Sequence, residues 1–119
     1  MHEMGIATEI VRIAIESIPA DLADPKVVRI NLKVGRLAAV VPQSLRFCFE
    51  VAAKETPAEG AELIIEEIAV AARCNACQHR WQIEDPVFQC PHCDSGSIEM
   101  LTGRELDIES IELADDDEA

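Results

Sequence analysis

Two stretches of the chain carry apolar residues three and four positions apart, which is the spacing of one face of an α-helix. The first spans residues 4–18, and Pro19 is expected to end it; its apolar positions are Ile6, Ala7, Ile10, Ile13, Ala14 and Ile18. The second begins at Pro42, because proline suits the first turn of a helix, where its missing N–H costs nothing. Its predicted buried face comprises Leu45, Cys48, Phe49 and Ala52.

Three further stretches predict β-strands, because apolar and polar residues alternate along them. In residues 28–34 the apolar positions are Val28, Ile30, Leu32 and Val34, so one face of this strand should be buried. The second strand is predicted over 63–70 and the third over about 104–113. The alternation slips at Glu66 and Glu67 in the second strand, which indicates a bulge or an edge position, and near Ser110 in the third.

The overall composition limits both the core and the partners. The 119 residues are 49% apolar but include only three Phe and one Trp, so the core should be aliphatic. With 23 acidic and 10 basic residues the net charge is −13, which repels nucleic-acid phosphates and anionic membranes. No apolar run approaches the ~20 residues of a membrane span, and the N-terminus lacks a basic signal region, so we expect a cytoplasmic protein.

Residues 73–98 differ in character from the rest of the chain. They hold four of the five cysteines, two of the three histidines and the only tryptophan, but few apolar residues. A segment this poor in apolar side chains cannot build its own core, so something else must hold it together. Thiols stay reduced in the cytoplasm, and these cysteines are therefore better explained as metal ligands than as disulfides.

The four cysteines of this segment form two C-x2-C pairs, Cys74 with Cys77 and Cys90 with Cys93, and twelve residues separate the pairs. Two intervening residues let one tight turn aim both sulfurs at one point, and two such turns complete a tetrahedron of thiolates around Zn²⁺. Trp81 is expected to pack a small hairpin between the pairs, together with Ile83. Four thiolates leave no position for an activated water, so the zinc would be structural.

Three other functions are compatible with parts of this pattern. A rubredoxin-like iron electron carrier uses the same four cysteines, but Gln78 and Asp94 stand where rubredoxins usually have glycine. A zinc-ribbon module for nucleic acid needs a basic or aromatic surface, which is hard to form amid 23 acidic residues. A cysteine- or metal-dependent enzyme needs a catalytic set or an open metal position, and neither is evident.

Three further side chains, two beside the cysteine pairs and one on the second predicted helix, have less specific interpretations. His79 and His92 lie beside the cysteines and are either exposed loop residues or partners in ligand exchange or ligand support. Cys48 is predicted to be a buried core thiol, because no cationic pocket or partner histidine is evident near it.

The N-terminus offers a second candidate metal site at His2. The Met1 amine, the His2 backbone nitrogen and the His2 Nδ1 atom can form fused chelate rings, which suit the square-planar preference of Ni(II) or Cu(II). The first N–H groups of a helix have no intrahelical partner, so recruiting one as a ligand breaks no hydrogen bond. Glu3 either adds a ligand or only complements the helix dipole.

Several short motifs in one order carry a family resemblance. They are Met1-His2-Glu3-Met4, Val34-Gly35-Arg36-Leu37, the run 41–50, Thr56-Pro57 with Gly60-Ala61 and Leu63, the two cysteine pairs, and Gly103-Arg104-Glu105-Leu106. Over residues 1–113 the chain resembles the HypA/HybF family of hydrogenase and urease nickel-incorporation metallochaperones. Gly5 departs from the pattern, because the family often has serine there, and the change would cost a helix cap.

The resemblance implies an α+β fold with two lobes. One lobe, residues 1–72 and 99–113, would combine a small mixed β-sheet with two helices and bind nickel through His2 and Glu3. The other, residues 73–98, would be an inserted zinc-ribbon-like lobe with Cys74, Cys77, Cys90 and Cys93 as zinc ligands. Residues 114–119 would form an acidic, disordered tail.

The function implied is delivery of nickel and not catalysis. In the family, nickel passes to the large subunit of [NiFe]-hydrogenase, with a nickel-handling maturation GTPase as partner. A metal-delivery protein must hold its cargo specifically and still release it, and few ligands at a chain terminus meet both needs. We therefore expect Ni(II) as cargo and Zn(II) as a structural ion, with no nucleic-acid or membrane partner.

Overall fold

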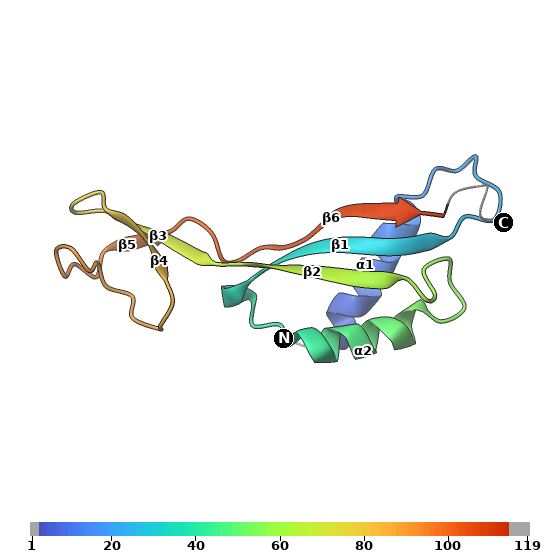
Figure 1. Ribbon diagram of the computed structural model, residues 1–119, viewed down its shortest axis with the longest axis horizontal. Helices are drawn as coiled ribbons and strands as arrows, with labels where there is room; N and C mark the ends of the chain where they lie inside the picture. Colours follow the sequence, from blue (N-terminus) through green and yellow to red (C-terminus); the bar gives the residue numbers. More distant parts are fainter. Residues whose placement is uncertain (1–2, 115–119) are drawn as a thin grey trace. The chain divides into compact units, whose positions relative to one another are not determined.

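The structure is a computed structural model that describes residues 3–114 (Figure 1). These residues form two compact units. The first comprises residues 3–32, 40–66 and 107–114, and the second comprises residues 33–39 and 67–106. Neither helix of this part of the chain has the length and apolar character needed to cross a membrane.

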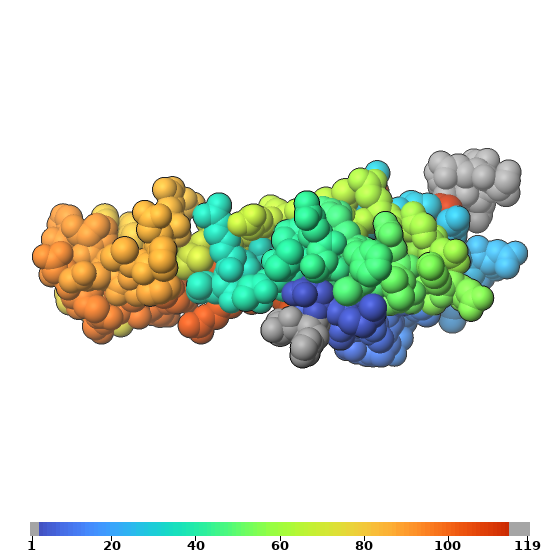
Figure 2. Space-filling model, turned by 90° about the horizontal axis from the view of Figure 1, so that it is seen from below, coloured from blue at the N-terminus to red at the C-terminus, as the bar shows by residue number. Residues whose placement is uncertain are grey.

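Both predicted helices are present and pack against each other in the first unit (Figure 2). α1 spans Glu3–Glu16 and buries Ala7, Ile10, Val11 and Ala14. α2 spans Pro42–Ala53 and buries Leu45, Phe49 and Ala53, with Pro42 in its first turn as predicted. α1 ends before the predicted residue 18, although the amides of Ser17 and Ile18 still donate to carbonyls of its last turn.

The prediction of which residues form the buried face of α2 was partly wrong. Cys48 is half-buried, not enclosed in the core, and its neighbour Phe47 is 65% exposed. The reason is geometric: the buried residues follow one line at intervals of four, through Leu45, Phe49 and Ala53. Cys48 lies beside that line, at the edge of the covered face.

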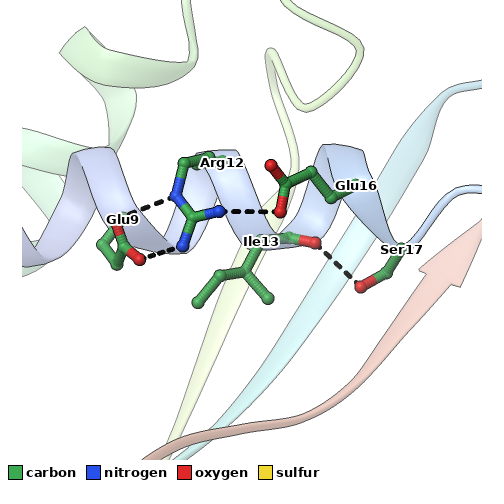
Figure 3. A network of polar contacts seen from close by, with 5 residues as sticks. All are labelled: Glu9, Arg12, Ile13, Glu16 and Ser17. Atoms are coloured by element: carbon green, nitrogen blue, oxygen red, sulfur yellow. Dashed lines mark hydrogen bonds and ion pairs between the residues drawn. The ribbon is translucent and has the colours of Figure 1, made fainter.

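The solvent face of α1 carries a short chain of ion pairs (Figure 3). Arg12 lies between Glu9, one turn before it, and Glu16, one turn after it, and pairs with both carboxylates. The Arg12 guanidinium lowers the pKa of Glu9 by donating a hydrogen bond to it. At the end of the helix, the Ser17 hydroxyl donates to the Ile13 carbonyl at 2.8 Å.

The first sheet has the strand order β2-β1-β6. β1 spans Val27–Gly35, β2 spans Glu62–Ile68 and β6 spans Leu106–Leu113. β1 and β2 run in the same direction, with α2 as the connection, and β6 runs in the opposite one (Figure 1). The sheet is therefore mixed, as predicted, and β2 is an edge strand, as the slip at Glu66 and Glu67 indicated.

The two faces of β1 differ as the sequence predicts, except at its start. Ile30, Leu32 and Val34 are buried. Val28 is 38% exposed and Val27 is fully buried instead, so the predicted alternation shifts by one residue at the beginning of the strand. On the opposite face, Arg29 pairs with Glu112 at 2.9 Å and with Glu62 at 3.6 Å, which ties both outer strands to β1.

The second sheet has the order β4-β3-β5, and both pairings are antiparallel. β3 spans Val70–Cys74, β4 spans Arg80–Ile83 and β5 spans Ile98–Met100. Its core comprises Val70, Ala72 and Ile83, with Trp81, Ile98 and Met100 packed against them. Trp81 and Ile83 do pack on a hairpin, but this hairpin is formed by β3 and β4 and includes the first cysteine pair, so it does not lie between the two pairs as predicted.

The prediction of a single strand over 63–70 was wrong, because the chain forms two strands there. β2 ends at Ile68 and β3 begins at Val70, so Ala69 interrupts the ladder. The Thr102 hydroxyl donates to the Ala69 carbonyl at 2.8 Å and accepts from the Ala71 amide at 3.0 Å. These two bonds satisfy backbone groups at the interruption.

Candidate metal centre

The four cysteines predicted to bind metal come together in the second unit. Their sulfur atoms all lie within 4.8 Å of one another. The distance is 3.5 Å between Cys74 Sγ and Cys93 Sγ, and 3.6 Å between Cys77 Sγ and Cys90 Sγ. A tetrahedral ion with metal–sulfur bonds of about 2.3 Å requires sulfurs about 3.8 Å apart. The cluster therefore has the size of a tetrathiolate metal site.

The first pair is held by a tight turn that follows β3. The Cys74 amide donates to the His79 carbonyl at 2.8 Å, and the Gln78 amide donates to the Cys74 carbonyl at 2.9 Å. Inside the turn, the amides of Ala76 and Cys77 point at Cys74 Sγ, at 3.3 and 3.4 Å. Cys74 is buried and Cys77 is exposed.

The second pair repeats this geometry. The Cys90 amide donates to the Ser95 carbonyl at 2.9 Å, and the Asp94 amide donates to the Cys90 carbonyl at 2.9 Å. The His92 amide points at Cys90 Sγ at 3.3 Å. Again the first cysteine is buried and the second is exposed. Two copies of one turn thus face each other across the metal position.

Gln78 and Asp94 occupy equivalent positions in the two turns. Both have left-handed backbones, with φ of 67° and 62°, which is the conformation that glycine adopts most easily. The lack of glycine does not alter these turns, so it does not distinguish zinc from iron. The Gln78 side chain adds a hydrogen bond to its own turn, because its side-chain amide donates to the Asn75 carbonyl.

The electrostatics of the cluster favour a cation. The Cys77 amide donates to the Cys74 sulfur and lowers the pKa of that thiol to about 6. At Cys93 the Ser95 amide favours the thiolate, but the adjoining Cys74 sulfur and desolvation outweigh it and raise the pKa to about 12. One thiolate therefore forms readily, and its neighbour resists a second negative charge so close to it. A divalent cation would remove that repulsion.

The two histidines form a stack with the tryptophan beside the cysteines. The ring centroids of His79 and Trp81 are 5.8 Å apart at an angle of 8°, and those of His79 and His92 are 5.1 Å apart at 24°. His79 is half-buried and His92 is exposed. This stack was missed from the sequence, although His79 and Trp81 are two positions apart, the spacing that puts side chains on one face of a strand.

The second candidate site lies mostly outside the described residues. Met1 and His2 fall before the described range, and Glu3 is the first residue of α1, where it is half-buried. A carboxylate at this position complements the positive end of the helix dipole. Gly5 lies within the first turn of α1, so a serine there would not occupy the capping position assigned to it from the sequence.

Comparisons with known proteins agree with both the fold and the cysteine cluster. Residues 1–113 match the family described as "Hydrogenase/urease nickel incorporation, metallochaperone, hypA". A hydrogenase maturation factor HypA from Desulfosudis oleivorans is 55% identical over 113 residues, which cover 95% of this chain and 98% of that protein. Another from Desulfatibacillum aliphaticivorans is 52% identical over 118 residues, which cover 99% and 91%.

The fold also matches a solved structure. The solution structure of the Ni metallochaperone HypA from Helicobacter pylori superposes with a TM-score of 0.66 at 22% sequence identity. The match covers 95% of this chain and 97% of that one, so the similarity of fold extends over nearly the full length of both chains.

Proposed function

Because this chain belongs to the HypA family of hydrogenase/urease nickel-incorporation metallochaperones, we propose how it holds nickel, which ion its cysteines bind and which proteins it serves. It is a nickel metallochaperone of hydrogenase maturation and not an enzyme. The observation that carries the proposal is the family match over residues 1–113 together with the four-cysteine cluster.

Nickel binds at the N-terminus, with His2 as the dominant ligand. The His2 imidazole and backbone nitrogen supply two ligands, and the Met1 amine or Glu3 completes part of a square plane. Glu3 begins α1, and the first amides of a helix have no intrahelical acceptor, so a His2 backbone nitrogen is available without loss. Few ligands and an incomplete coordination sphere allow the cargo to leave.

The cysteine cluster holds one structural Zn²⁺. The reduced cytoplasm and the closed set of four thiolates support zinc, and four protein donors that fill a tetrahedral site support a structural role. Analysis of the purified protein should find one zinc per chain and no colour. An iron site, the alternative for the same ligands, would give a red protein.

The chain acts in the cytoplasm and passes nickel to the large subunit of [NiFe]-hydrogenase, assisted by a nickel-handling maturation GTPase. The GTPase docks on the unit that contains the two helices. A net charge of −13 supports protein partners with basic patches and argues against nucleic acid or anionic membrane as partners. Urease, which the family description includes, is a second proposed recipient of the nickel.

The decisive experiment compares nickel and zinc binding in wild-type protein and in His2→Ala. The substitution should abolish stoichiometric nickel binding measured by calorimetry, while zinc content and helical circular dichroism stay unchanged. A matched control is His92→Ala, which removes a histidine near the other metal site and should leave nickel binding intact. A His2→Ala protein that binds one nickel with unaltered affinity would overturn the proposed site.

A further variant separates the ligands of the terminus. Adding one residue before Met1 moves the amine away from the His2 chelate. Nickel binding should weaken if the amine is a ligand and should hardly change if Glu3 fills that place. Glu3→Gln supplies the complementary measurement, because it removes the carboxylate and leaves the amine in place.

A further inference from the structure

Outside the metal cluster, the second unit carries a shallow hollow on the segment that joins the two cysteine turns. It encloses about 270 Å³ and is lined by four apolar residues, Trp81, Ile83, Val87 and Pro91, by two acids, Glu84 and Asp85, and by two glutamines, Gln82 and Gln89. Ile83 is buried beneath it, whereas Val87 is 60% exposed and the adjoining Phe88 is 46% exposed. The metal site uses none of these side chains.

Fixed elements hold the hollow on both sides. β4 pairs with β3, which anchors Trp81 opposite Ala72 and Ile83 opposite Val70. On the other side, the Gln89 side-chain amide donates to the Asp94 carbonyl at 2.7 Å and ties the loop to the second cysteine turn. The Val87 amide closes a tight turn on the Asp85 carbonyl at 2.6 Å. These bonds fix the backbone on both sides of the hollow, and Val87 is exposed to solvent there.

The charge at the rim of the hollow is uncompensated. Neither Glu84 nor Asp85 forms an ion pair with any residue between 3 and 114. The second unit contains one lysine, Lys33, and four arginines, of which Arg36 is already paired with Glu67 at 2.6 Å and Arg73 with Glu99 at 2.6 Å. An apolar floor beside two unpaired carboxylates is complementary to an apolar side chain that is followed by a cation.

We infer that this hollow docks a segment of a partner protein in which an aliphatic side chain is followed by Lys or Arg. The aliphatic side chain covers Trp81 and Val87, and the cation lies against Glu84 and Asp85. A second copy of this chain is disfavoured as the occupant, because each copy carries a net charge of −13. A hollow of about 270 Å³ offers little contact surface, which implies weak, rapidly reversible docking and suits a protein that must leave after delivery.

The chain contains its own reporter for the test, because Trp81 is its only tryptophan. The full metal-loaded protein is titrated with the synthetic peptide GSLKRLSG, and tryptophan emission and backbone amide NMR shifts are recorded. Emission should move to shorter wavelength, with shifted amides confined to residues 80–91. The peptides GSLEELSG and GSSKRSSG keep the length but remove the cations or the aliphatic anchors. Loss of the anchors should weaken binding about tenfold or more, as expected for a leucine that stays in water.

Protein variants complete the experiment. Glu84→Gln and Asp85→Asn should each raise the dissociation constant of GSLKRLSG about two- to fivefold, the effect of one screened surface ion pair, and added salt should do the same. Glu50→Gln, which neutralises an exposed acid on α2, is the matched control and should change nothing. Val87→Ser should weaken binding with zinc content unchanged.

Three results would overturn the inference. The first is unchanged tryptophan emission and unchanged amide shifts with GSLKRLSG. The second is an equal response to GSSKRSSG, which would reduce the effect to general attraction between opposite charges. The third is an emission shift that grows with protein concentration in the absence of peptide, because the occupant would then be a second copy of the chain.

Discussion

Gly35 and Gly103 meet backbone to backbone in the second unit. A Cβ atom on Gly35 would lie 2.1 Å from both the carbonyl carbon and the carbonyl oxygen of Gly103. The Leu37 amide donates to the Gly103 carbonyl at 2.7 Å, and the Gly35 amide donates to the Glu105 carbonyl at 2.7 Å. The two glycine-containing motifs, 34–37 and 103–106, are thus two sides of one close contact.

Gly35→Ala should destabilise the protein by about 2–3 kcal/mol, because the added methyl group meets fixed backbone atoms that cannot rotate away. Urea unfolding followed by circular dichroism measures the change. Gly96→Ala is the control, since a Cβ at Gly96 meets nothing within 4 Å, and it should stay within about 0.5 kcal/mol of wild type. Equal stability of the two variants would contradict the close contact.

Gly5→Ala should have the opposite sign. Gly5 is exposed inside α1, and a Cβ there would meet nothing within 4 Å. Alanine in an exposed helix position is more favourable than glycine by roughly 0.5–1 kcal/mol, because it restricts the unfolded chain. The unfolding midpoint should rise accordingly. A fall would mean that the N-terminal turn of α1 needs the freedom of glycine.

The sequence predicts the parts of this fold that depend on local periodicity. α1, α2 and the alternation along β1 follow from single stretches of residues, and the two cysteine turns follow from their own spacing. The break at Ala69 could not be predicted, because the Thr102 hydroxyl that bonds there lies 33 residues further along the chain. The pattern of apolar residues simply continues through the interruption.

The extent of the unit that contains the cysteines also depends on contacts between distant residues, which a local sequence pattern does not show. The sequence marks residues 73–98 by composition, whereas the compact unit around the cysteines also takes in 33–39 and the strands β3 and β5. Contacts such as that between Gly35 and Gly103 join distant stretches, and composition does not record them. The stack of His79 on His92 is similar, because two separate turns must fold before these rings meet.

The ion pair between Arg29 and Glu112 should make stability sensitive to acid. The Asn31 amide and then the Arg29 guanidinium hold the pKa of Glu112 below its ordinary value of 4.5. A depressed pKa in the folded state means that the stabilisation is present above pH 4.5 and is lost as the pH falls below it. Glu112→Gln should therefore lower the urea midpoint at neutral pH and lose less stability than wild type on acidification. Glu50 makes no ion pair among residues 3–114, so Glu50→Gln should have the stability of wild type at neutral and at acidic pH.

Removal of residues 115–119 tests what the acidic end contributes to partner binding. The segment carries three aspartates and one glutamate, which act at long range on a basic partner. Truncation should change the salt dependence of association with the proposed partner, a maturation GTPase, more than the equilibrium strength of that association, as measured by calorimetry at two salt concentrations. Complete loss of the complex would place the main contact on this segment and not on the helices.

The last prediction concerns the independence of the two units. Cys74→Ser or Cys93→Ser removes one sulfur of the cluster and should abolish the proposed stoichiometric zinc binding, because metal binding and folding are coupled in a small metal lobe. NMR signals of β4 and the two cysteine turns should collapse, and Trp81 emission should move to longer wavelength as the ring enters water. α1, α2 and the β2-β1-β6 sheet should persist, because they bury their own aliphatic core, which includes Ile30, Leu32 and Leu45.

Cys48→Ser is the matched control: it makes the same chemical change at a half-buried cysteine outside the cluster and should retain zinc and the Trp81 emission. Cooperative loss of the helices in Cys74→Ser would show instead that the metal holds the whole chain together.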